Sequence, residues 1–179
     1  MVTLETPRLI LRRWREGDIA PMAAVNADPE VMRWIRDGSV RDERQTREGI
    51  RAWEDEWESH GFGLFAVELR STGELAGFTG LAVPHFLPEI LPAVEVGWRL
   101  GRAHWGRGLA TEAAAAAVRF AFEERGLERI VSVAQVGNDA SERIMVKLGM
   151  RLFRETVSPA AGRPVRVFEL SSDQYAASV

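Results

Sequence analysis

A turn that contains two closely spaced glycines is the first candidate for chemistry in this sequence. Gly106 and Gly108 flank a single arginine, between an apolar, β-prone segment ending at Leu100 and an alanine-rich segment beginning near Leu109. Glycine lets the backbone turn tightly and approach a ligand closely. The first amides of the helix that follows have no partner inside it and lie at the positive end of its dipole. The turn therefore predicts a site that binds a phosphate or diphosphate through backbone N–H groups.

Two common phosphate-binding motifs do not fit this turn. A P-loop has Lys and then Ser or Thr after its second glycine, but Arg107 and Gly108 follow Gly106. A dinucleotide fingerprint needs a third glycine and, after the next strand, an acid that binds ribose. Thr111 stands in place of that glycine, and Gln135-Val136-Gly137-Asn138 follows the next strand. The sequence therefore predicts neither nucleotide hydrolysis nor dinucleotide binding.

A third pattern fits. The segment Trp105-Gly106-Arg107-Gly108-Leu109-Ala110 resembles the Arg/Gln-x-x-Gly-x-Gly/Ala signature of the GNAT superfamily of N-acetyltransferases, with Trp105 at the first position. Its continuation through Thr111-Glu112-Ala113 resembles the ribosomal-protein N-acetyltransferase (Rim-type) branch, as do segments 4–12 and 28–32. The resemblance covers roughly residues 4–170, which is nearly the whole chain.

The resemblance implies that the turn binds the diphosphate of acetyl-CoA, which is the co-substrate of the superfamily. Pantetheine is then expected in a gap beside the strand before the turn, and Asn138 is expected to bond its amide. Without a ligand, the turn would be only a tight connection between strand and helix. The cofactor-binding residues implied in this way are Trp98, Arg99, Leu100, Trp105, Gly106, Arg107, Gly108, Leu109, Ala110, Thr111 and Asn138.

Glu95 is the candidate general base, because it is a carboxylate in an otherwise apolar strand. Only an uncharged amine attacks a thioester, and most amines are protonated at neutral pH, with pKa values of about 7.7–8.0 for an α-amine and about 10.4 for lysine. A base accepts that proton directly or through water, and burial would raise the pKa of Glu95. An exposed strand face or a structural ion pair are the alternatives. The Rim-type resemblance, with Glu at this position, favours the base.

The leaving thiolate needs a proton or a hydrogen-bond donor. The single tyrosine, Tyr175, falls in the C-terminal tail. The Rim-type resemblance therefore assigns the donor to Ser141, in the pattern Asn138-x-x-Ser141. The structural alternative is an ordinary helix start, since Asn and Ser are common there and Asp139-x-x-Glu142 has the form of a capping box.

Length, net charge and residue composition limit the number of domains, the partners and the metal sites that we expect. A chain of 179 residues with 46% apolar composition can bury one core, so we expect a single GNAT domain over residues 1–179. The net charge of −3 gives no reason to expect a nucleic-acid or membrane partner. There is no cysteine and the three histidines are scattered, so no metal is expected. No apolar run approaches a membrane span, and we expect a cytoplasmic protein.

Apolar periodicity and turn residues predict the element order β, α-α, β-β-β, α, β, α, β-β. This order indicates a mixed sheet of the α/β or α+β kind. The resemblance implies a mostly antiparallel central sheet of about six to seven strands with helices on both faces. The expected strands lie near 9–14, 64–69, 75–83, 94–100, 130–136, 151–154 and 165–170, and the expected helices near 18–26, 28–35, 43–58, 109–125 and 138–148.

The predicted function is direct transfer of the acetyl group of acetyl-CoA to a primary amine, either a protein N-terminal α-amine or a small-molecule amine. The alternative is a non-catalytic acyl-CoA-binding or partner-binding module of the same fold. Such a module would bind CoA without turning over any amine. A candidate base and a candidate acid favour the enzyme. The acceptor and the oligomeric state stay open, and a homodimer is one option.

Overall fold

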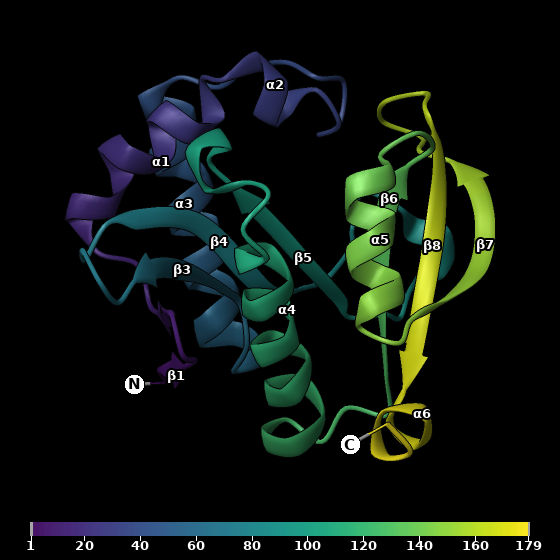
Figure 1. The fold of residues 1–179 in the computed structure, drawn as a ribbon. Helices are drawn as coiled ribbons and strands as arrows, with labels where there is room; N and C mark the ends of the chain where they lie inside the picture. Colours follow the sequence, from purple (N-terminus) through teal and green to yellow (C-terminus); the bar gives the residue numbers. More distant parts are fainter. Residues whose placement is uncertain (1, 179) are drawn as a thin grey trace.

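One eight-stranded sheet runs through the protein in the order β1-β2-β3-β4-β5-β6-β8-β7 (Figure 1). All neighbouring strands are antiparallel except β5 and β6. The structure is a computed structural model that describes residues 2–178. The strands are β1 (Leu4–Glu5), β2 (Leu9–Arg12), β3 (Leu64–Leu69), β4 (Leu75–Ala82), β5 (Glu95–Leu100), β6 (Arg129–Gln135), β7 (Arg151–Val157) and β8 (Pro164–Ser171).

The predicted mixed, mostly antiparallel sheet is confirmed, with one strand more than expected. The extra strand is β1, whose two residues pair with β2. Two residues are too few to produce a periodic pattern, so β1 could not be predicted from the sequence.

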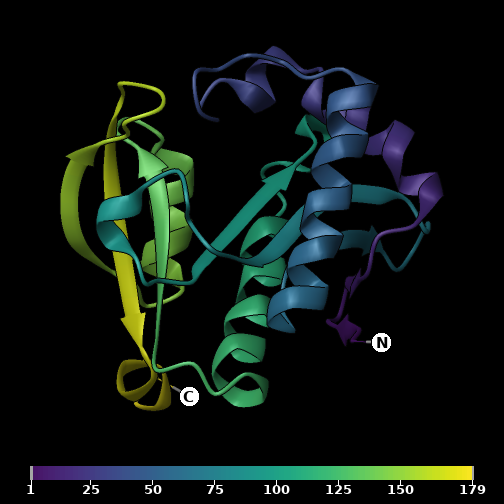
Figure 2. The same ribbon diagram turned by 180° about the vertical axis from the view of Figure 1, so that it is seen from behind.

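Helices cover both faces of the sheet (Figures 1 and 2). α3 lies on one face, and α4 and α5 lie on the other. Short 3-10 segments occur at Glu16–Asp18, Pro88–Ile90 and Arg102–His104, and a π-helical segment at Phe120–Glu124 extends α4. The helix α6 was not predicted. The α-helices are α1 (Ile19–Asn26), α2 (Pro29–Met32), α3 (Glu43–His60), α4 (Leu109–Arg119), α5 (Asp139–Lys147) and α6 (Ser172–Ala176).

Two apolar layers fix these helices to the sheet. On one face, the alanines of α4 pack in the same cluster as Val96 and Leu100 of β5. Small side chains let α4 lie close to the strands, and alanine has the highest helix propensity. On the other face, Ile50 of α3 and Trp14 pack with Phe78 of β4. The central strands are apolar on both sides because both faces are covered.

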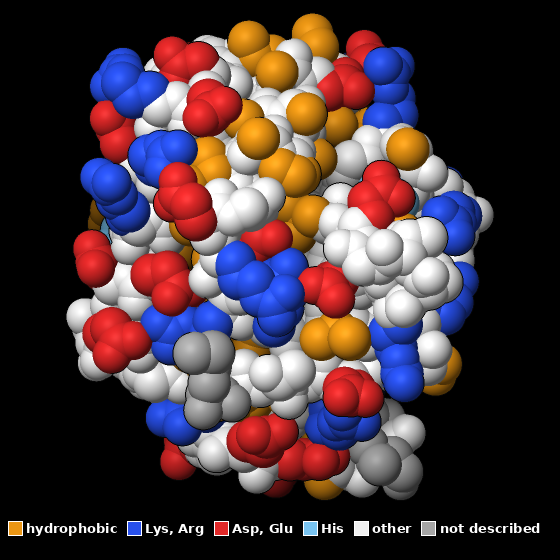
Figure 3. Space-filling view, turned by 90° about the vertical axis from the view of Figure 1, so that its left-hand side faces the viewer, with side chains coloured by type: hydrophobic (Ala, Val, Ile, Leu, Met, Phe, Trp, Pro, Cys, Tyr) orange, Lys and Arg blue, Asp and Glu red, His pale blue; other side chains and the backbone are white. Residues whose placement is uncertain are grey.

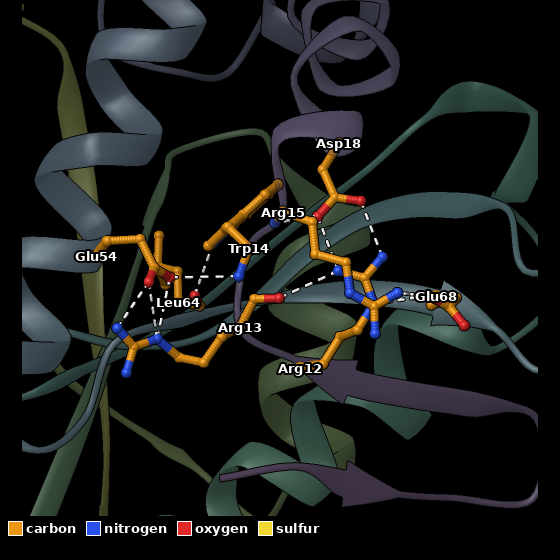
Figure 4. Close-up of polar contacts among 8 residues, drawn as sticks. All are labelled: Arg12, Arg13, Trp14, Arg15, Asp18, Glu54, Leu64 and Glu68. Atoms are coloured by element: carbon orange, nitrogen blue, oxygen red, sulfur yellow. Dashed lines mark hydrogen bonds and ion pairs between the residues drawn. The ribbon is translucent and has the colours of Figure 1, made fainter. Parts of the chain in front are cut away.

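Charged side chains at the end of β2 and just after it form ion pairs that connect α1 and α3 to the sheet (Figure 4). Arg12 makes two hydrogen bonds to Asp18, at 2.8 and 2.9 Å, and one to Glu68 at 2.7 Å. Arg13 binds Glu54 of α3 at 2.7 Å. Asp18 precedes α1, where an aspartate often caps the helix. Its side chain makes no cap bond there, because its carboxylate binds Arg12 and the Arg15 N–H.

The face shown in Figure 3 carries acidic and basic side chains side by side, so no patch of a single sign dominates it. Within residues 2–178, no helix is long and apolar enough to cross a membrane. The same residues contain no group of three or more His, Asp or Glu placed to hold a metal ion.

Candidate active site

β5 and β6 are parallel neighbours that separate almost at once. Their ladder consists of the pair Glu95 and Val131, with a bond from Val131 N to the Val94 carbonyl at 2.9 Å. Ser132 Oγ then donates to the Val96 carbonyl at 2.8 Å. Beyond this point the strands diverge, as Figures 1 and 2 show. The backbone of β5 therefore has an unpaired edge toward β6, which can hydrogen-bond an extended ligand.

A cavity of about 510 Å³ lies at this opening, within the range of small-molecule sites. Its walls come from the end of β5, the glycine turn, the first turn of α4, the start of α5, and α2 with the loop after it. Of the predicted site residues, the structure brings together around this cavity Trp98, Arg99, Leu100, Trp105, Gly106, Gly108, Leu109, Ala110, Thr111, Asn138 and Ser141. Arg107 and Glu95 do not line it.

The glycine turn has the geometry that its sequence predicted. Gly106 and Gly108 have φ values of 71° and 74°, in the left-handed region that favours glycine. The first hydrogen bond of α4 runs from Glu112 N to the Gly108 carbonyl at 3.1 Å. The N–H groups of residues 109–111 consequently have no partner inside the helix, and these residues line the cavity. The arrangement suits an anion such as a diphosphate.

Trp105 occupies the first signature position in place of Arg or Gln. Its indole Nε1 donates to the Leu100 carbonyl at 2.9 Å, which fixes the turn against the end of β5. The side chain is otherwise 47% exposed. The indole N–H thus gives this position a structural role.

Arg8, near the N-terminus, binds the glycine turn and the first turn of α4. This contact was not predicted from the sequence. Arg8 Nη1 donates to the Arg107 carbonyl at 2.8 Å, and Arg8 Nε lies 2.6 Å from Glu112 Oε2. Glu112 Oε1 also accepts from Thr6 Oγ1 at 2.6 Å. Partial burial opposes ionisation, but these hydrogen bonds lower the pKa of Glu112 below its ordinary value. About one hundred residues separate the partners, so no local pattern links them.

Glu95 lies at the start of β5, beside the point where the strands part. It is half-buried, and the loss of solvation raises the pKa of its carboxyl to about 8. A backbone hydrogen bond from Val133 opposes this change, and the negative charge of Glu56 adds to it. A carboxyl with this pKa can take up a proton near neutral pH.

Asn138 and Ser141 are hydrogen-bonded to each other at the start of α5. The Ser141 N–H donates to Asn138 Oδ1 at 3.4 Å, which orients the amide, and Asn138 Nδ2 donates to Ser141 Oγ at 3.2 Å. The Ser141 hydroxyl accepts this bond, so its own hydrogen is free for another acceptor. In the structural alternative, the capping box between Asp139 and Glu142 does not form, because Glu142 pairs with Arg166 at 3.1 Å, whereas Asn138 does cap the helix.

The side chain of Arg99 has its partners in α1 and β4. Although Arg99 lines the cavity, its Nη1 donates to Asn26 Oδ1 at 2.7 Å, and the guanidinium lies 5.0 Å from the centre of the Phe78 ring. Those contacts are on the face of β5 opposite to Val96 and Leu100. Further lining residues that the sequence did not single out as cofactor-binding include Arg33, Trp34, His104 and Lys147. They come from segments without a phosphate-binding motif.

The sequence matches the family described as acetyltransferase (GNAT) domain over residues 8–151. The chain belongs to this family. It is 33% identical over 170 residues to the uncharacterized protein YkkB of Bacillus subtilis, covering 94% of this chain and 95% of the relative. It is 30% identical over 148 residues to the uncharacterized N-acetyltransferase YoaA of the same organism, covering 83% and 82%. A solved acetyltransferase from Agrobacterium tumefaciens is 28% identical, with a TM-score of 0.79 and coverage of 93% and 94%.

The Rim-type branch is represented among many structural neighbours. RimL, a ribosomal-protein alpha-N-acetyltransferase solved in complex with coenzyme A, has a TM-score of 0.78 at 14% identity, covering 97% of this chain and 99% of RimL. That identity shows a common fold alone. Membership of the GNAT family is therefore established, whereas membership of the Rim-type branch is not.

Proposed function

We propose that this protein is an acetyl-CoA-dependent N-acetyltransferase that transfers the acetyl group directly to a primary amine, as a single domain over residues 1–179. One observation carries the proposal: the unpaired amides of residues 109–111 and the unpaired edge of β5 border one cavity. The amides offer a site for the diphosphate of acetyl-CoA, and the strand edge offers hydrogen bonds to pantetheine.

In the proposed reaction the uncharged amine attacks the thioester carbonyl carbon, and the carbon–sulfur bond breaks. Glu95 takes the proton that the amine loses, directly or through water. The free hydroxyl hydrogen of Ser141 donates a hydrogen bond to the departing thiolate, which then takes a proton from solvent, and Asn138 keeps the hydroxyl oriented. No covalent intermediate on the protein is needed, since both substrates are held in one complex.

The acceptor in this proposal is a protein N-terminal α-amine, as in the Rim-type branch, or a small-molecule amine. A cytoplasmic location, a Rim-type assignment and a homodimer stay predictions. The alternative, an acyl-CoA-binding module without activity, predicts binding alone.

One experiment separates the two. Acetyl-CoA should raise the melting temperature of the purified protein, and a CoA-release assay should show turnover with at least one member of a panel of amines and N-terminal peptides. Stabilisation without turnover on the whole panel would favour the non-catalytic module. Absence of stabilisation would contradict the site itself.

A further inference from the structure

The face of β5 that carries Glu95 also carries Arg99, with Gly97 between them. Side chains alternate along a strand, so residues 95, 97 and 99 point to the face opposite to Val96 and Leu100. The two charged residues are four positions apart, which is about 13 Å along the strand. A Cβ placed on Gly97 would meet no heavy atom within 4 Å. This face of β5 therefore carries an acidic side chain, Glu95, and a basic side chain, Arg99, with open space at Gly97 between them.

Among residues 2–178, no carboxylate forms an ion pair with Arg99 at the basic end. Arg99 Nε is buried without a hydrogen-bond partner, and within the same residues the one side-chain acceptor of the guanidinium is the neutral amide of Asn26. Asn26 is itself fixed by a bond from its Nδ2 to Thr46 Oγ1 at 3.0 Å. Desolvation, and then the positive charges of Arg41 and Arg36, lower the pKa of Arg99 to about 9. The group still carries its charge at neutral pH.

The neighbouring arginines do not supply a carboxylate either. Arg36 and Arg41 make no ion pair within residues 2–178. Burial lowers the pKa of Arg41, and the negative charge of Asp37 opposes this only in part, while the Asp37 carboxylate accepts two hydrogen bonds from Ser39, at 3.0 and 2.6 Å. A buried guanidinium beside two further arginines is unfavourable unless an anion joins it.

The acidic end has the opposite charge pattern. Glu56 of α3 acts on the carboxyl of Glu95 through its negative charge, and Glu56 Oε2 is buried without a partner. Two carboxyl groups near each other favour an ammonium group between them, because its charge offsets their repulsion. The open space beside Gly97 thus lies between a carboxyl pair, which suits a cation, and a guanidinium, which suits an anion.

We propose that the amine acceptor also carries an anionic group, of the carboxylate or phosphate class, which binds at Arg99 while its amine lies at Glu95. This rests on the proposed function and narrows its acceptor. The guanidinium forms strong charge-assisted bonds to either class of anion. A polyamine, which has a cation at both ends, would place positive charge against the arginines and fits this site poorly.

The test compares matched acceptors by CoA release. ω-Amino carboxylates of increasing chain length and aminoalkyl phosphates are compared with ω-amino amides of equal length, which lack the charge, and with spermine. A charge-assisted bond predicts that kcat/KM for the best anionic acceptor exceeds that of its amide by roughly 10- to 100-fold. Arg99→Gln should bring this ratio close to one, and Arg99→Lys should retain part of it. Arg51→Gln, at an exposed arginine of α3, is the matched control and should leave the ratio unchanged.

Gly97→Leu gives an independent test that does not remove a charge. Its side chain enters the open space, so KM for the anionic acceptor should rise at least tenfold, while stabilisation by acetyl-CoA stays as in the wild type. Equal rates with carboxylate, phosphate and amide acceptors, or an unchanged ratio in Arg99→Gln, would overturn the inference and leave the acetyltransferase proposal intact. Binding of acetyl-CoA with no turnover on any amine would instead overturn both.

Discussion

Glu95→Gln tests whether burial of this carboxyl governs both stability and turnover. The ordinary pKa of 4.5 rises to about 8 in the folded protein. At about 1.36 kcal/mol per pH unit, this difference corresponds to an upper bound of about 5 kcal/mol. Glu95 is half-buried, so solvent screens part of this, and we expect about 2 kcal/mol.

The sign of the change in the free energy of unfolding with pH follows from proton linkage. Below about pH 4.5 the carboxyl is protonated in both states and contributes no penalty. Between 4.5 and about 8 the unfolded chain releases the proton while the folded chain holds it, so the free energy of unfolding falls as pH rises. Glutamine cannot ionise. The variant should match the wild type near pH 4.5 and exceed its stability by about 2 kcal/mol at pH 8.5.

Urea unfolding across this pH range measures the difference, and about 2 kcal/mol corresponds to roughly 4–8 °C in melting temperature for a chain of this length. Glu124→Gln, at an exposed glutamate, is the control and should show no pH-dependent difference. In the wild type, kcat/KM should rise with pH through about 8 as Glu95 ionises, and the variant should keep only the rise that comes from deprotonation of the amine acceptor. A stability difference that stays constant with pH, together with an unchanged pH–rate profile, would refute the reasoning.

Three other substitutions test the cofactor side of the site. Gly108→Val places a β-branched residue at φ 74°, so it should destabilise the protein by about 1–3 kcal/mol and weaken acetyl-CoA binding. Thermal unfolding with and without acetyl-CoA measures both effects. Normal affinity for acetyl-CoA would contradict the anion site. Ser141→Ala should lower kcat by roughly tenfold or more with little change in KM for acetyl-CoA, and an unaltered kcat would leave Ser141 with its helix-capping role alone. Glu112→Gln removes the ion pair with Arg8. It should weaken acetyl-CoA binding by a few-fold and reduce stability by about 1 kcal/mol. Calorimetric titration measures the affinity for acetyl-CoA, and an unchanged affinity would show that this ion pair does not order the turn.

Local chemistry explains what could be predicted without coordinates. The left-handed glycines at 106 and 108, the alanine-rich helix and the alternation of strands and helices all depend on neighbours in sequence, so the order of most elements and the geometry of the glycine turn were predictable. The two-residue β1 and the short α6 were not, because elements of that length carry no period.

Contacts between distant segments could not be predicted from local patterns. The resemblance implied that Arg99 lies beside pantetheine, and the residue lines the cavity, but nothing in the sequence indicated that its guanidinium binds Asn26 of α1. Asp18 precedes α1 and is of a type that often caps helices, yet its carboxylate binds Arg12.

The glycine turn, the order of most strands and helices, and the choice of Glu95 and Ser141 as candidates for base and donor all follow from the sequence or from the family pattern that it carries. Each depends on residues within a few positions of one another. The separation of β5 from β6, the raised pKa of Glu95 and, among residues 2–178, the absence of an ion pair at Arg36 and Arg41 become visible only in the folded protein. These depend on desolvation and on charges brought together across the sheet, and no local pattern encodes them.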